Sequence, residues 1–163
     1  NKYKSKAKED LKDKLIINVD QITEKVLLGS VILFPNLLNL FKKNFESINF
    51  TIKEFNDIKQ RILSLLNTKK TIENINLKTK LLGSGYQKIV KKLIDNSIYT
   101  HAPFLRFKND FEKVSAGWKG YWDIYNKRIE DFKFKNDAEG MLHKLNKESY
   151  TRFKNLKIVN NKN

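Results

Sequence analysis

Carboxylates that could act together as general acid and base are confined to one long amphipathic segment and the turn expected after it: Glu112, Asp123, Glu130, Asp131 and Glu139. They occupy polar positions, and Lys127 and Lys135 follow at a spacing typical of solvated helix-surface ion pairs. No nucleophile elbow or comparable catalytic motif accompanies them. The sequence therefore predicts no catalytic residues.

Metal and phosphate sites are also unsupported. The chain has no cysteine, and its two histidines, His101 and His143, would make a poor metal site unless carboxylates joined them. The only glycine cluster, Gly83-Ser84-Gly85, lacks the Lys-Ser/Thr pair of a phosphate-binding loop. It indicates the end of a helix and a turn, and we interpret His101 as a solvated helix-end residue. No metal ion and no cofactor is expected in this chain.

The composition permits two explanations of the charge. The 163 residues carry a formal net charge of +15, but only four of the 33 basic residues are Arg. A genome-wide drift toward Lys, Asn and Ile would produce this high net charge, and so would a surface selected to bind nucleic acid. No apolar run reaches the ~20 residues of a membrane helix. Because the chain begins with Asn and carries no signal-peptide pattern, we interpret it as a piece of a larger soluble, intracellular protein.

Amphipathic segments predict a helical bundle over residues 20–102. Asp20 can cap a helix that Pro35 ends, and the same Pro can open a second helix. Thr51 and Glu54 match a capping box for a third helix, and shorter helices follow. Residues 1–19 are expected to be a basic linker or lead-in.

A long aromatic stripe dominates the C-terminal part. Between Phe104 and Phe132 the large apolar residues recur at intervals of three and four, as on one side of an α-helix. A turn is expected around residues 135–137, and a last helix from about 138 to 158 is expected to fold back antiparallel. We therefore predict an all-α protein in which a compact bundle is followed by a protruding C-terminal helical hairpin over residues 103–158, with residues 159–163 as a tail.

Four residues near the middle of the stripe bear on its role. Trp118 is predicted to be core, whereas Trp122 stands beside the main stripe and fits either the core or an interface. Gly117 and Gly120 disfavour a helix. A second helix that approaches closely would explain them, and so would a bend.

Four segments resemble the C-terminal, helicase-binding region of bacterial DNA primase of the DnaG type, most like its alphaproteobacterial branch. They are VLLGSVILFPNLLNL (26–40), FTIKEFNDIKQRILSLL (50–66), GWKGYWDIY (117–125) and ESYTRFKNLK (148–157). The resemblance covers roughly residues 20–158. It rests on apolar pattern and not on a catalytic signature, and Lys and Asn replace the usual Ala and Arg between the apolar positions.

The resemblance implies a non-catalytic domain that docks primase on the replicative DNA helicase (DnaB type) during primer synthesis, in the bacterial cytoplasm. The parent chain would be the polymerase, with zinc and magnesium bound by its other domains. The contact would involve Tyr121, Trp122, Tyr125, Arg128, Ile129, Lys147, Tyr150, Arg152, Phe153 and Leu156. Self-association through the hairpin is left open. A basic helical nucleic-acid-binding module is the alternative function.

Overall fold

The computed structural model describes residues 21–68, 72 and 75–160, and for Phe153 and residues 155–160 it describes the backbone alone. The predicted linker 1–19 and most of the predicted tail lie outside these residues. The described part is helical and contains no strand, which confirms the all-α fold class.

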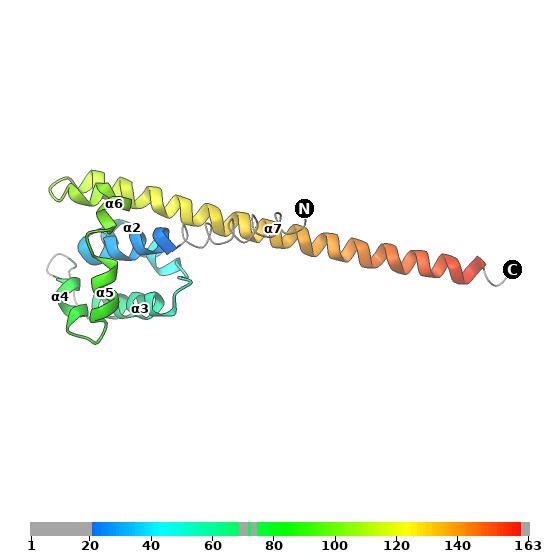
Figure 1. The fold of residues 1–163 in the computed structure, drawn as a ribbon, viewed down its shortest axis with the longest axis horizontal. Helices are drawn as coiled ribbons and strands as arrows, with labels where there is room; N and C mark the ends of the chain where they lie inside the picture. The colour runs from blue at the N-terminus through cyan, green and yellow to red at the C-terminus, as the bar shows by residue number, and fades with distance from the viewer. Residues whose placement is uncertain (1–20, 69–71, 73–74, 161–163) are drawn as a thin grey trace, which may run out of the picture. The chain divides into compact units, whose positions relative to one another are not determined.

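The helices follow one another with short connections (Figure 1). A helix over residues 21–33 ends just before Pro35, as predicted. It is followed by α2 (Leu37–Ser47), α3 (Lys53–Asn67), α4 (Leu77–Leu82), α5 (Gln87–Leu93), α6 (Ile98–His101), the 3₁₀ helix η1 (Pro103–Arg106) and α7 (Phe111–Asn160).

Two compact units divide the chain, one ending at Tyr125 and the other beginning at Asn126. The boundary lies inside the predicted hairpin instead of near residue 102. The reason is that the first turns of α7 belong to the core of unit 1, where Val114 and Trp118 are fully buried. Large apolar side chains of the other helices complete this core, among them Leu27, Leu37, Phe45, Ile58, Ile62, Leu81 and Leu93.

The predicted hairpin turn is not present in this structure. Residues 135–137 are helical, so the two predicted antiparallel helices form the single continuous helix α7. The stretch from Lys133 to Glu139 contains neither Pro nor Gly, and Asn136 and Asp137 each disfavour a helix by less than ~1 kcal/mol. That cost is too small to force a break. The start also differs, because Phe104 lies in η1 and α7 begins at Phe111.

Two glycines allow helices and side chains of unit 1 to approach closely. A Cβ at Gly29 would lie 2.6 Å from Ile98 Cδ1 and 2.7 Å from the Leu93 carbonyl oxygen. A Cβ at Gly117 would overlap the ring of Phe104, whereas a Cβ at Gly120 would meet nothing within 4 Å. The close neighbour predicted at these positions is therefore real at Gly117, where it is a Phe ring of η1.

Candidate functional site

Two of the predicted contact residues, Tyr121 and Tyr125, hold α7 on the bundle of unit 1. The Tyr121 hydroxyl donates to the His101 carbonyl oxygen. The Tyr125 hydroxyl accepts the Asn49 N–H (3.0 Å) and contacts the Asn49 carbonyl oxygen (3.2 Å). Burial raises the pKa of both tyrosines above the ordinary value of 10.0. Their hydroxyl groups are thus occupied within unit 1.

The Trp122 ring is part of a series of stacked aromatic rings. Its centroid lies 6.3 Å from that of Trp118 and 5.8 Å from that of Tyr125, and Phe41 of α2 stacks on Trp118 at 4.8 Å. The Trp118 indole N–H donates to the Leu27 carbonyl oxygen at 3.1 Å. Trp118 is core, as predicted, while Trp122 is half-buried and packs against that core.

The loop over residues 48–52 is fastened by side chains from several helices, a feature that the sequence did not reveal. The buried Glu24 carboxylate accepts hydrogen bonds from the Thr51 N–H (2.9 and 3.1 Å) and from the Thr51 hydroxyl (3.0 Å). Asn56 bonds both backbone groups of Phe50. These contacts replace the predicted capping box: α3 has Ile52 at its N-cap and no side-chain cap bond.

Lys59 supplies a further bond to this loop. Its ammonium group donates to the carbonyl oxygens of Glu46 and Ile48. Burial lowers the pKa of Lys59 below 10.5, and the nearby Glu46 carboxylate opposes that shift. All these contacts are directed inward, so we assign the loop a role in stability and not in chemistry.

The other predicted contact residues lie on the later turns of α7. Arg128 and Ile129 are half-buried, and Lys147, Tyr150 and Arg152 are exposed. The side chains of Phe153 and Leu156 lie outside the described part of the chain. Tyr121 and Tyr125 thus bond within unit 1, whereas Lys147, Tyr150 and Arg152 are exposed on unit 2.

Unit 2 exposes a set of large apolar side chains, among them Phe132 at the end of the aromatic stripe and Tyr150, which is one of the predicted contact residues. More than half of each side chain is accessible in Phe132, Phe134, Met141, Leu142, Leu145 and Tyr150. Phe134, Met141 and Leu145 are separated by seven and four residues, a spacing that keeps them on one side of a helix. Phe132 and Tyr150, 18 residues apart, share a different side. We call these six residues the exposed apolar set.

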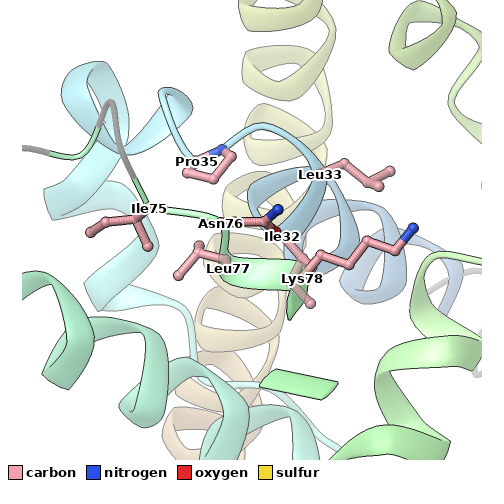
Figure 2. Close-up of a pocket in the computed structure, with 7 residues that line it drawn as sticks. All are labelled: Ile32, Leu33, Pro35, Ile75, Asn76, Leu77 and Lys78. Carbon is pink, nitrogen blue, oxygen red and sulfur yellow. The ribbon is translucent and has the colours of Figure 1, made fainter. Parts of the chain in front are cut away.

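A cavity between the end of the helix over residues 21–33 and the start of α4 offers little chemistry (Figure 2). Its volume is ≈ 480 Å³. Ile32, Leu33, Pro35, Ile75 and Leu77 supply apolar walls, and Asn76 and Lys78 are its polar residues. Asn76 is already used as the cap of α4, because its side-chain oxygen accepts the Thr79 N–H at 3.0 Å. Among the described residues, no acid, base or nucleophile pair lines this cavity.

Two other clefts carry more charge. One of ≈ 540 Å³ has an apolar floor that includes Phe55 and Leu93, with Lys25, Glu54, Lys92 and Asp95 also lining it. Lys25 and Asp95 form an ion pair there at 3.1 Å. The other, of ≈ 520 Å³, is lined by Asn96, Tyr99, Arg106 and Lys108. We call it the Arg106 cleft.

Neither a metal centre nor a membrane span is found in the part of the chain that the structure describes. No group of three or more His, Asp or Glu side chains there could hold a metal ion. None of the described helices is long and apolar enough to cross a bilayer. Comparison of the chain with protein-family models, with curated proteins and with solved structures gives no match. The primase resemblance therefore stays a prediction.

Proposed function

We propose that this chain is a non-catalytic interaction domain that docks a DNA primase on the replicative DNA helicase during primer synthesis. The observation that carries the proposal is the exposed apolar set of unit 2. Large apolar side chains that are this accessible, and that recur along a helix, are typical of surfaces that bind another protein.

The exposure of apolar side chains in unit 2 supports the proposal that this helix binds a partner. An isolated helix in water gains little stability from its backbone, and most of it must come from packing of an apolar face. Within unit 2 the side chains of the exposed apolar set remain largely accessible to solvent. A partner that covers them would remove apolar area from water, and this burial would stabilise the complex by ~25 cal/mol per Å².

The choice of partner rests on the sequence resemblance, which includes residues 148–157 of unit 2 and residues 117–125 just before it. In this proposal the contact shifts away from Tyr121, Trp122 and Tyr125, whose side chains stabilise unit 1. Its centre is the exposed apolar set. Arg128, Lys147 and Arg152 then supply charged groups beside it, where they would affect association rate more than affinity.

A matched pair of substitutions tests this assignment. Leu142 in unit 2 and Leu40 in α2 are both 60% exposed, so glutamate at either position has a similar small effect on folding. We expect Leu142→Glu to weaken binding to the helicase of the same organism by about 10- to 100-fold, the equivalent of ~1.5–3 kcal/mol for one buried leucine. Leu40→Glu should leave binding unchanged.

Isothermal titration calorimetry with the purified helicase measures these affinities, and size-exclusion chromatography of the chain alone reports any self-association. If the wild-type chain does not bind the helicase, the proposed partner is wrong. If it binds but Leu142→Glu and Leu40→Glu behave alike, the partner is right and the surface is wrong.

A further inference from the structure

Beyond docking to a protein, one region of unit 1 has the chemistry of a nucleic-acid contact. Residues 75–109 carry seven of the 33 basic residues and only one of the 18 acidic residues, Asp95. The basic residues are Lys78, Lys80, Lys88, Lys91, Lys92, Arg106 and Lys108. A drift toward Lys raises the number of cations everywhere, but it does not by itself remove carboxylates from one region.

The single carboxylate of this region already has an ion-pair partner. Asp95 pairs with Lys25 at 3.1 Å and accepts bonds from the N–H and hydroxyl of Ser97. These hydrogen bonds, above all the one from the Ser97 hydroxyl, lower the pKa of Asp95. Its carboxylate therefore stays ionised and bound to its partners. Just beyond the region, Asp110 pairs with Lys113 at 3.0 Å.

The Arg106 cleft gathers several kinds of group that bind a nucleotide. Arg106 and Lys108 are exposed at its edge, and neither forms an ion pair with a described carboxylate. A guanidinium group binds phosphate oxygens through two parallel N–H donors, and a lysine adds a point charge. Tyr99 contributes a half-buried ring, and Asn96 an amide that can both donate and accept.

The size of the cleft favours a single strand over a duplex. A volume of ≈ 520 Å³ lies in the usual range for small-molecule sites and suits one nucleotide unit. Single strands are commonly held by a basic surface that follows the backbone together with an aromatic ring on which a base stacks. Sequence-specific recognition of a duplex instead needs an element that enters a groove, so the cleft alone would hold a duplex only through its phosphates.

We propose that the Arg106 cleft binds single-stranded nucleic acid without sequence preference, with phosphate held by Arg106 and Lys108 and a base placed on Tyr99. The proposal is independent of helicase docking, because it concerns unit 1 and the exposed apolar set lies in unit 2.

Fluorescence anisotropy of the full chain with a labelled single-stranded oligonucleotide of mixed sequence tests it, over a series of salt concentrations. For Arg106→Gln/Lys108→Gln we expect about tenfold or greater loss of affinity near 0.1 M salt. The slope of log K against log[salt] should become shallower by about 1.4, since each lost contact to a single strand contributes ~0.7. Tyr99→Leu should lower affinity and leave that slope unchanged.

The control is Lys135→Gln/Lys144→Gln, which removes the same charge from exposed positions of unit 2. It should change affinity less than twofold. Equal losses in the two double variants would mean that diffuse positive charge, and not the cleft, attracts the strand. The proposal is also overturned if the wild-type chain shows no salt-dependent binding, or if an unlabelled duplex competes better than an unlabelled single strand. Circular dichroism verifies that each variant keeps its helix content.

Discussion

The two glycines in the first half of α7 provide a direct test of how this helix packs. Gly117 and Gly120 lie three residues apart in the same helix, and alanine should favour the helical backbone by about 1 kcal/mol at either position. They differ in what a methyl group would meet. At Gly120 the space is open, while at Gly117 the methyl group would overlap the ring of Phe104.

The magnitudes follow from these surroundings. Gly120→Ala should raise the free energy of unfolding of unit 1 by about 1 kcal/mol. Gly117→Ala receives the same gain from the backbone, but the Phe104 ring must move, and overpacking of this kind costs ~1–3 kcal/mol. The difference between the two variants removes the backbone term, so it reports the steric cost alone.

Urea unfolding followed by tryptophan fluorescence is the suitable assay, because both tryptophans, Trp118 and Trp122, lie in unit 1. We expect the midpoint of Gly120→Ala to lie above that of the wild type and the midpoint of Gly117→Ala to lie clearly below that of Gly120→Ala. If the two variants are equally stabilised, Phe104 does not cover Gly117, and the packing of η1 on α7 described above is incorrect.

Three further substitutions test the contacts that fasten the loop over residues 48–52 and the first half of α7. Glu24→Gln should lower the free energy of unfolding by about 1–3 kcal/mol, because the amide can replace only part of the carboxylate's bonds to Thr51; an unchanged urea midpoint would contradict this. Tyr125→Phe removes the hydroxyl group that bonds Asn49 and should lower it by about 0.5–1.5 kcal/mol in the same assay. The third test varies pH. Because burial raises the pKa of Tyr121, the folded chain holds its proton more tightly than the unfolded chain does. That stabilising contribution is complete below pH 10.0 and is lost as the pH rises through the folded pKa. Urea midpoints measured from about pH 9 to about pH 11 should therefore fall more for the wild type than for Tyr121→Phe. Parallel declines would show that folding does not raise the pKa of Tyr121.

Local patterns were sufficient to predict much of unit 1. Pro35 separates the helix over residues 21–33 from α2 because a proline cannot donate the next helical bond. Phe50, just before α3, packs on Phe55 in its first turn, with ring centroids 5.9 Å apart. Gly83 ends α4, as the glycine cluster indicated. These features depend on neighbours within a few residues, and such neighbours can be read from the sequence.

Features that depend on distant residues were not predictable in the same way. Thr51 matches a capping box, but the Glu24 carboxylate, 27 residues earlier, binds it instead. Tyr125 belongs to an apolar stripe, yet its hydroxyl group finds Asn49, 76 residues away. The turn expected at residues 135–137 rested on the need to cover apolar side chains, whereas the local backbone preference there permits a helix.

The loop over residues 48–52 also determines where this protein can accept added sequence. Insertions are usually tolerated in surface connections because little depends on their backbone. In this loop the backbone groups of Asn49, Phe50 and Thr51 are each bonded by a side chain from another part of unit 1. An epitope or a fluorescent label inserted here would remove several of these bonds at once. The turn at Gly83–Gly85 is the better site for such a label. The hydroxyl and the N–H of Ser84 there both bond the carbonyl oxygen of Leu81, a few residues earlier in the chain.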